Sequence, residues 1–492
     1  MKDKYDIVVI GSGIGGLVSA ALLSSLGKRI LVIEKEPKPG GYLTEFKNED
    51  FIFDVSLHLL NGCAKGQYTY NMFERCHIID EIKFLRPKYL YRSIFPDFDL
   101  RIPQMNLREY TEMLGDLFPK SRKGIKILFD EMSRIFQVVN SYFSSKRVTP
   151  LLLQRLTSNY KTMLDQHIND IKLKAIISQL WIYLGLPPSL LRAIDFCYPW
   201  FDYMNNGGYY VEKGSYEIVR ALVSHIRNKR GDFLFNKNVG RILTENGFGR
   251  RIAFGKDEIF CDTIISNIDL TKTIFELIGS SKFSTADIAK IRNIEPSISA
   301  FEIFLGLDVD LSATYPDDYE IFVNTDYDID KQYQDCLNNN AKSAPFVITV
   351  NSNVNRFAAP KGKSVVTIIM LAGYGHWISK SRGEYEDKKH KVAEILMDRA
   401  GKIIPEIKKN PHKKAVSTPV TFERYTNNAA GAIYGYSRTV GQKTEIRPNE
   451  MNNIKNLYFA SAWAKQGSGV VKVLHSADDV YKKISKTVDA KL

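Results

Sequence analysis

The sequence contains few cysteines, and their arrangement suggests neither a metal centre nor a disulfide framework. Its 492 residues include five cysteines, an odd number, and no two of them form a CxxC pair. Zinc sites and small disulfide-bonded folds need paired cysteines at short, regular spacing. We therefore expect reduced, buried thiols and no bound metal, which weakly favours a reducing compartment such as the cytoplasm.

Long apolar segments are also missing. The first apolar run, Ile7–Ile10, leads directly into glycines and has no basic segment before it, which does not fit a signal peptide. The strongest late run, Val365–Ala372, is far shorter than the roughly 20 residues that cross a bilayer. The sequence therefore predicts no membrane-spanning helix.

No nucleic-acid-binding module is recognisable, although the formal net charge is +13. A basic surface without such a module fits an anionic membrane better than a nucleic acid, and a solvated surface with no partner explains the charge equally well. Basic residues outnumber acidic ones between Lys120 and Lys174, among Ile, Leu, Phe and Tyr. This pattern fits either an amphipathic helix lying peripherally on a membrane or a surface helix packed on the protein.

The N-terminal segment has the pattern of a strand, a glycine loop and a helix. Residues 5–10 form a β-branched run that is typical of a buried parallel strand, and residues 17–26 have helical spacing. Between them, Gly11, Gly13 and Gly16 fill the G-x-G-x-x-G spacing. In this motif the glycines allow a tight turn, close approach of a pyrophosphate and close packing of the helix on the strand.

Two further features support a dinucleotide site. Ile14 and Gly15 complete the loop at the helix N-terminus, where free N–H groups and positive partial charge favour phosphate. The second strand ends at Glu34, followed by Lys35, and a carboxylate about 20 residues past the glycines accepts hydrogen bonds from ribose hydroxyls. That carboxylate disfavours NADP, but the motif alone does not distinguish FAD from NAD.

The following segment contains a second glycine pair, Gly40–Gly41, and then Phe51, Phe53 and Asp54 in an alternating strand pattern. This arrangement resembles the flavoprotein group of phytoene desaturases, carotene cis–trans isomerases, retinol saturases and amine oxidases. Three more segments resemble conserved parts of that group: 206–222, 235–269 and 456–484. The segment 418–436 resembles the carotenoid desaturase, isomerase and saturase branch in particular.

The resemblance implies FAD as the cofactor and identifies its contacts. Val239 would meet the adenine through its backbone, and Asn267 follows the second FAD-contacting strand. The closing segment would place Gly467, Gly469 and Val470 at the flavin or pyrophosphate. With the residues of the first unit, the expected FAD contacts are Gly11, Gly13, Ile14, Gly15, Gly16, Glu34, Lys35, Gly40, Gly41, Val239, Asn267, Gly467, Gly469 and Val470.

The implied fold is α/β (α+β overall), with a Rossmann-like FAD-binding domain of the glutathione-reductase-2 type and an inserted mixed helix and sheet substrate domain. The FAD-binding domain is expected to be discontinuous, and residues 76–204 have mostly helical spacing that is broken at Pro187–Pro188 and Pro199. Residues 291–444 contain three apolar runs of strand length and one segment with helical spacing. The expected segments are 1–75, 205–290 and 445–492 for FAD, 76–204 for the helical part and 291–444 for the sheet, with strands at 299–307, 345–350 and 365–371 and a helix at 385–400.

The resemblance implies an FAD-dependent oxidoreductase that desaturates, saturates or isomerises a hydrophobic polyene or isoprenoid lipid, as in carotenoid biosynthesis. His58 is the titratable residue that motif position brings toward the flavin, where it could move a proton or stabilise a charged intermediate; the alternative is a packed structural histidine bonded to backbone. Arg424 and Tyr425 are further candidates to face substrate or flavin, or to form a structural pair. The alternatives are an amine or porphyrinogen oxidase, and a non-catalytic lipid-binding escort protein. The oligomeric state is left open.

Overall fold

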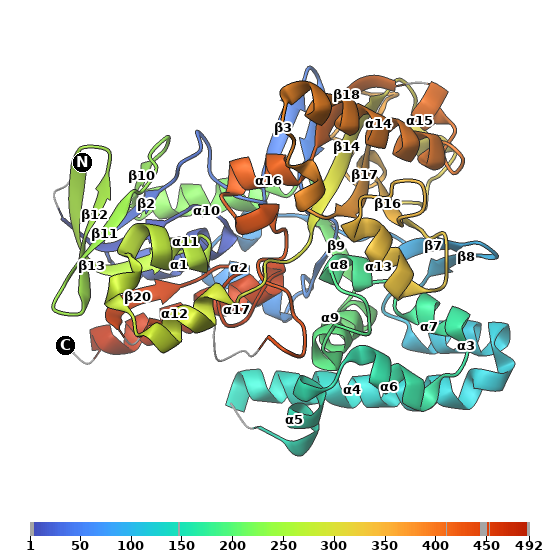
Figure 1. Cartoon of the computed structure of the whole chain (residues 1–492), viewed down its shortest axis with the longest axis horizontal. Helices are drawn as coiled ribbons and strands as arrows, with labels where there is room; N and C mark the ends of the chain where they lie inside the picture. The colour runs from blue at the N-terminus through green and yellow to red at the C-terminus, as the bar shows by residue number, and fades with distance from the viewer. Residues whose placement is uncertain (1–3, 146–147, 410, 443–449, 452, 490–492) are drawn as a thin grey trace.

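The computed structural model describes residues 4–145, 148–409, 411–442, 450–451 and 453–489. Two sheets lie on opposite sides of the molecule (Figure 1). The helices of residues 107–206 lie below the second sheet in this view. The mixed α/β fold class is confirmed. The division into three segment groups stays a prediction.

The first sheet is built around two parallel, buried strands. β1 (Lys4–Ile10) pairs with β2 (Ile30–Ile33) on one side and with β13 (Asp257–Ser266) on the other. β13 also pairs in parallel with β20 (Ile454–Phe459), so distant parts of the chain share one sheet. The remaining described strands are β10 (Asp232–Leu234), β11 (Arg241–Glu245), β12 (Phe248–Phe254) and β19 (Glu450–Met451).

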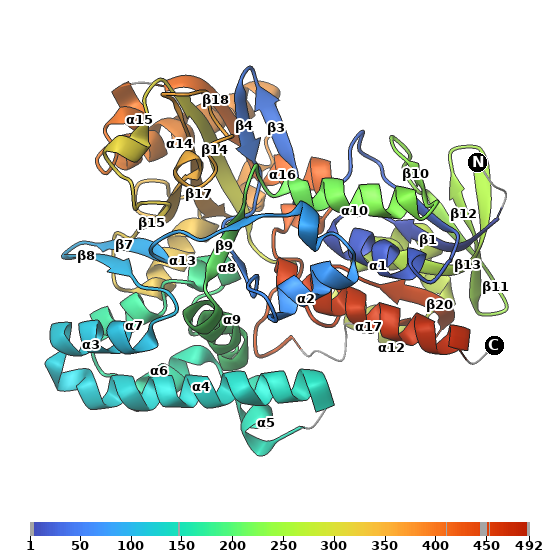
Figure 2. The same ribbon diagram turned by 180° about the vertical axis from the view of Figure 1, so that it is seen from behind.

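Helices cover both faces of this sheet. α1 (Ile14–Ser24) is buried along almost its whole length and packs between α10 (Tyr216–Asn228) and α17 (Val470–Asp489) (Figure 2). Its side chains are therefore apolar or small on every face, as expected for a helix that is enclosed by protein. On the opposite face lie the short α11 (Leu270–Lys272) and α12 (Thr285–Arg292) (Figure 1).

The second sheet is buried on both faces at its centre. Its central strands β14 (Ser299–Leu307), β16 (Phe346–Val350) and β17 (Ser364–Ala372) are buried at every residue and pair antiparallel. They match the three strands that the sequence predicts. The sheet order is β18 (Pro411–Ser417), β14, β17, β16, β15 (Glu320–Val323), β7 (Tyr91–Phe95) and β8 (Phe98–Ile102), with α13 (Ile329–Leu337), α14 (Arg382–Ala400) and α15 (Glu406–Lys409) beside it.

The helix expected at residues 385–400 begins three residues earlier than its spacing predicts. Ser381 is the N-cap of α14, and its side chain accepts a hydrogen bond from the backbone N–H of Glu384 (3.2 Å). A serine three residues before a glutamate is a recognised helix start. The sequence therefore contains the signal for the start of α14 at Arg382.

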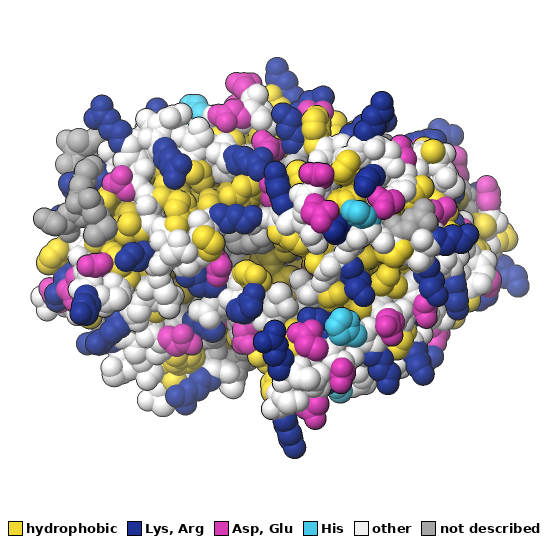
Figure 3. All heavy atoms as spheres, turned by 90° about the horizontal axis from the view of Figure 1, so that it is seen from above, with side chains coloured by type: hydrophobic (Ala, Val, Ile, Leu, Met, Phe, Trp, Pro, Cys, Tyr) yellow, Lys and Arg dark blue, Asp and Glu magenta, His cyan; other side chains and the backbone are white. Residues whose placement is uncertain are grey.

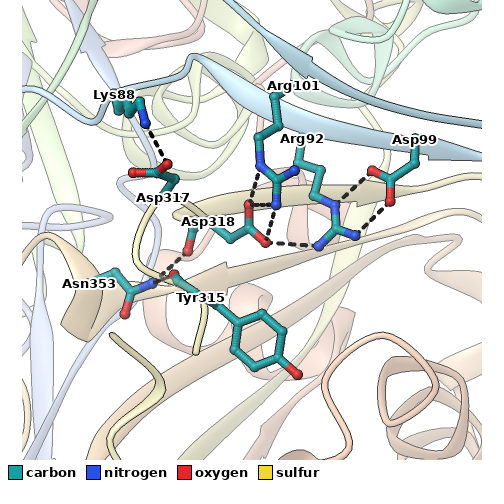
Figure 4. Close-up of polar contacts among 8 residues, drawn as sticks. All are labelled: Lys88, Arg92, Asp99, Arg101, Tyr315, Asp317, Asp318 and Asn353. Carbon is teal, nitrogen blue, oxygen red and sulfur yellow. Dashed lines mark hydrogen bonds and ion pairs between the residues drawn. The ribbon is translucent and has the colours of Figure 1, made fainter. Parts of the chain in front are cut away.

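The β7–β8 hairpin differs from the mostly helical expectation for residues 76–204. A buried ion network attaches it to the loop before β15: Asp318, about 2% exposed, accepts from Arg92 (2.8 Å) and Arg101 (3.0 Å). Arg92 also binds Asp99 across the hairpin, and Asn353 donates to the backbone carbonyl of Asp318 (Figure 4). These charge-assisted contacts hold the hairpin as the outer edge of the second sheet.

The remaining helices of the insertion lie below the second sheet, and most of them form the layer at the bottom of Figure 1. They are α3 (Leu107–Leu117), α4 (Arg122–Ser145), α5 (Pro150–Thr157), α6 (Tyr160–His167), α7 (Ile171–Ile177), α8 (Trp181–Leu184) and α9 (Ala193–Asn206). The expectation that Pro199 breaks the helical pattern is wrong, since α9 continues through it. Phe196, Trp200 and Phe201 are buried on either side of the proline, and this packing offsets the lost backbone hydrogen bond.

The described part of the chain has no helix that is both long and apolar enough to span a bilayer. All five cysteines are buried and free of disulfides.

Candidate functional site

A cavity of about 1110 Å³ extends from the glycine loop after β1 to the second sheet. Pockets for a single small molecule typically measure roughly 300–1,000 Å³, so this space exceeds the needs of one drug-sized ligand. Seen from above, apolar side chains surround a hollow near the middle of the molecule, with charged side chains around it (Figure 3). The cavity therefore has room for a cofactor and a substrate together.

The two glycine motifs lie against each other at one end of the cavity. Gly11 has φ +89°, which a residue with a side chain rarely adopts, and Gly13 caps the N-terminus of α1. Gly13 forms an isolated parallel bridge with Gly40, whose N–H donates to the carbonyl of Ser12 (3.1 Å). Gly41 also lies beside Gly13. The structure thus brings together two glycine motifs that are separated in the sequence.

Close backbone packing fixes the start of α1. A Cβ atom built on Gly15 would lie 1.9 Å from the carbonyl oxygen of Ala460, just after β20. A Cβ atom on Gly13 would lie 2.7 Å from the side-chain nitrogen of Asn267, whose backbone N–H donates to the carbonyl of Ile10 (2.9 Å). Glycine is required at position 15, where a side chain would meet backbone, whereas a side chain at position 13 would have to displace the amide of Asn267.

Glu34 holds the glycine loop from the end of β2. Its Oε2 accepts hydrogen bonds from the backbone N–H (2.9 Å) and the hydroxyl (2.6 Å) of Ser12, and its Oε1 accepts from the N–H of Glu36 (3.0 Å). The carboxylate is 8% exposed and lines the cavity. It is therefore preoriented, with acceptor capacity left for a ribose hydroxyl.

Most of the other expected FAD contacts line the same cavity. Ile14, Lys35, Val239, Asn267, Gly469 and Val470 all do so. Gly15, Gly16 and Gly467 do not line it: Gly15 and Gly16 pack against backbone, and Gly467 lies beside Tyr436 and Arg438. Lys35 contacts the carboxylate of Glu36 and donates to the backbone carbonyl of Arg424 (2.9 Å). The individual roles of these residues stay predictions.

A cationic cluster, which sequence inspection missed, lies at the N-terminus of α17. Asp195 on α9 is bound by Arg192 (2.6 Å) and Lys472 (2.9 Å), and Arg438 lies 3.7 Å away. Burial would raise the pKa of Asp195, but the attraction of these three cations holds it well below its ordinary value. Arg438 and Lys472 line the cavity, so this wall carries excess positive charge beside the positive end of a helix dipole.

His58 lies in a polar cluster at the other end of the cavity. Its Nδ1 is 2.7 Å from Oε1 of the buried Glu320 on β15 and 3.2 Å from the hydroxyl of Thr349. The other oxygen of Glu320 accepts from the hydroxyl of Tyr183, and Tyr319 donates to the backbone carbonyl of His58 (2.6 Å). The carboxylate of Glu320 therefore fixes the orientation of the imidazole ring.

Arg424 and Tyr425 lie near the end of α16 (Pro419–Thr426) and line the cavity. The guanidinium of Arg424 donates to the Tyr425 hydroxyl (2.8 Å), and Tyr425 is 51% exposed. Because Lys35 binds the backbone carbonyl of Arg424, these two residues adjoin the end of β2. The hydrogen-bond partners of the His58 ring come instead from β15 and β16.

The end of the cavity at the second sheet is largely apolar. It is lined by Ile182, Leu184, Val347, Ile369, Leu371, Val416, Phe422 and Ile433. One acid, Glu302 on β14, lies among these residues and is 4% exposed. Its position in an otherwise hydrophobic strand was the sequence signal that could have identified it.

The parallel sheet, the helix N-terminus at a glycine loop and the preoriented Glu34 fit an adenine dinucleotide, so the fold and site define a dinucleotide-binding protein. The chain belongs to the flavin-containing amine oxidoreductase family, whose model matches residues 14–479. It is an FAD-dependent oxidoreductase, and its resemblance to the carotenoid desaturase and isomerase branch is confirmed. When bound, FAD supplies hydride transfer.

Two curated relatives cover nearly the whole chain. Prolycopene isomerase 1 of an Oncidium hybrid cultivar, a chloroplastic protein, is 26% identical over 510 residues, covering 96% of this chain and 82% of the relative. The 4,4'-diapophytoene desaturase of Staphylococcus aureus strain Newman is 23% identical over 507 residues, covering 98% of this chain and all of the relative.

Solved structures share the fold. An oxidoreductase from Methanosarcina mazei has a TM-score of 0.67 at 17% identity, covering 97% of this chain and 100% of its own. A putrescine oxidase bound to putrescine has a TM-score of 0.69 at 12% identity, covering 98% of this chain and 99% of its own. At these identities the match establishes the architecture alone.

Proposed function

We propose that the protein acts on a hydrophobic polyene or isoprenoid lipid, such as a carotenoid-like hydrocarbon, by desaturation, saturation or cis–trans isomerisation. The observation that carries this proposal is the continuity of one cavity from the glycine loops to the apolar wall of the second sheet. A hydrocarbon bound there would lose its contact with water against the side chains of β14, β16 and β17. The names of the two curated relatives support the same substrate class.

We further propose that the expected FAD contacts act as the sequence predicts. Glu34 would hold the ribose, the N-terminus of α1 would hold the pyrophosphate, and Gly469 and Val470 would contact the flavin or the pyrophosphate. The substrate end would then adjoin His58, whose ring is oriented by Glu320 (2.7 Å). The chain's own task is to orient the hydrocarbon, exclude water and move a proton.

The direct test is to purify the protein, record its flavin spectrum and extract any bound lipid for mass spectrometry. Flavin-loaded protein would then be incubated with candidate polyenes under oxidising and reducing conditions, and the products analysed by chromatography. We expect conversion of at least one polyene. Flavin-loaded protein that converts amines or porphyrinogens but no polyene would refute the substrate assignment.

We also propose that the protein is cytoplasmic and that it contacts an anionic membrane peripherally through its helical insertion. Among the described residues between 105 and 190, seven large apolar side chains are exposed: Met105, Leu117, Ile127, Val148, Leu153, Ile171 and Leu190. Between Lys120 and Lys174 the chain forms several helices rather than one, and α4 begins with Arg122 and Lys123. Exposed apolar groups beside basic ones suit an anionic bilayer surface.

Flotation with anionic and with neutral vesicles tests the membrane contact. The protein should float with anionic vesicles, and the double variant Leu153→Ser, Ile171→Ser should float less. Equal recovery of both proteins, or none with anionic vesicles, would contradict the proposal.

A further inference from the structure

Glu302 is an acid in a hydrophobic wall. Along β14, side chains alternate between the two faces of the sheet, so Glu302 shares its face with Ala300 and Phe304. Ala300 belongs to an apolar cluster with Ile369 and Phe422, and Phe304 belongs to another with Phe46, Phe51 and Phe53. Glu302 thus lies between two apolar clusters and lines the cavity.

The carboxyl of Glu302 has no counter-ion within the described ranges. Its Oε2 is buried and has no hydrogen-bond partner there, and no Lys, Arg or His side chain of those ranges forms an ion pair with it. Every other buried cavity acid described above has partners that satisfy it, as Glu34 has Ser12. A buried polar atom without a partner requires an explanation, and the position of Glu302 in the cavity favours a role toward a ligand.

The titratable groups that face Glu302 do not neutralise it. They are Asp54 on β4 (Phe51–Asp54), Tyr42 and Tyr434. Asp54 accepts from the Tyr210 hydroxyl (2.7 Å), while Tyr42 and Tyr434 donate to backbone carbonyls. Burial, together with the charge of Asp54, raises the pKa of Glu302 well above its ordinary value. Burial in this apolar wall therefore favours the protonated, neutral form of Glu302.

We propose that Glu302 is the residue that delivers a proton to a carbon atom of the hydrocarbon substrate. This inference rests on the proposed function, because it needs a polyene in the cavity. The O–H bond of Glu302 breaks as a C–H bond forms from the π electrons of one double bond, which leaves an allylic cation and the Glu302 carboxylate.

The allylic cation can react further in two ways that account for every proton and electron. In isomerisation, the former double bond rotates and the same carbon returns a proton to Glu302, with no net oxidation or reduction. In saturation, a hydride supplied by reduced FAD adds to the cation, and Glu302 regains its proton from water. Desaturation would instead require an ionised Glu302 to accept a proton from a substrate C–H bond, and the apolar wall disfavours that form. The proposal therefore favours isomerisation or saturation.

Turnover in D₂O tests the step. Wild-type protein loaded with FAD and supplied with a polyene that it converts should incorporate deuterium into the product. Glu302→Gln should bind FAD and the polyene, but its turnover should fall by about 10²–10⁴-fold, the usual contribution of a general acid, and deuterium incorporation should be lost. The matched control is Glu131→Gln, which changes a buried glutamate that is ion-paired with Arg155 outside the cavity.

Each outcome decides a separate claim. Conversion by wild-type protein without deuterium in the product, or unchanged turnover by Glu302→Gln, would overturn the role of Glu302 and leave the proposed function standing. If no polyene is converted, the proposed function fails. The protonation of Glu302 is checked independently by infrared difference spectra of wild type and Glu302→Gln near pH 7, where a protonated carboxyl band should be missing from the variant. If the band that the variant lacks is instead that of a carboxylate, Glu302 is ionised in the wild type and its proposed role as an acid is ruled out.

Discussion

The close contact between Gly15 and Ala460 predicts that Gly15→Ala destabilises the fold and weakens FAD binding. In Gly15→Ala the new Cβ would lie 1.9 Å from the carbonyl oxygen of Ala460 and 2.8 Å from Oδ1 of Asn267. A carbon and an oxygen in ordinary contact lie about 3.3 Å apart, so α1 and the end of β20 must separate by roughly 1.4 Å. Both elements are backbone in the core, and neither can move aside as a flexible side chain can.

Overpacking of a core typically costs 1–3 kcal/mol, and a clash between backbone elements belongs at the upper end. We therefore expect Gly15→Ala to lower the free energy of unfolding by about 3 kcal/mol. Because Asn267 and the glycine loop move with α1, FAD should bind at least about tenfold more weakly, which corresponds to roughly 1.4 kcal/mol. Denaturant unfolding and titration of the apoprotein with FAD measure the two effects.

Gly375→Ala is the matched control, because a Cβ there meets no atom within 4 Å and the backbone is not in the left-handed region. It should leave stability and FAD affinity close to those of the wild type. If Gly15→Ala behaves like this control, the packing of α1 on β20 does not shape the cofactor site, and the reasoning is refuted.

Three other substitutions test separate parts of the structure. Asp195→Asn leaves three cations beside a neutral group and should lower the free energy of unfolding by about 3 kcal/mol at neutral pH. Because the pKa of Asp195 is depressed in the folded state, the difference in unfolding free energy between wild type and variant should narrow as the pH falls below about 4. A difference that does not change with pH would contradict this prediction. His58→Gln should retain FAD while turnover falls about 100-fold, and unchanged turnover would remove His58 from the reaction. Asp318→Asn should lower unfolding free energy by roughly 1–3 kcal/mol and expose the β7–β8 hairpin to proteolysis, whereas Lys88→Gln, which removes an exposed pair, should change neither.

The parts of the fold that sequence reasoning recovered are those with local signals. The strand, glycine loop and helix of residues 5–26 and the apolar runs of β14 and β17 follow from residue spacing, and the cofactor follows from family resemblance. The acid at the end of β2 was also readable because its distance from the glycines is fixed by the βαβ geometry. These elements need no knowledge of long-range contacts.

The parts that were missed depend on contacts between distant segments. Asp195 looks like an ordinary helix acid until α17 brings Lys472 beside it, 277 residues later. The β7–β8 hairpin was hidden in a mostly helical segment because its partner strand, β15, follows more than 200 residues later. The break expected at Pro199 does not occur, because burial of its neighbours outweighs the tendency of proline to end a helix.

The most direct test of the central claim is the product analysis of flavin-loaded wild-type protein given a carotenoid-like polyene. The account predicts flavin absorbance in the purified protein and a polyene product that is isomerised, saturated or desaturated. Protein that holds FAD but returns every polyene unchanged, under both oxidising and reducing conditions, would contradict it.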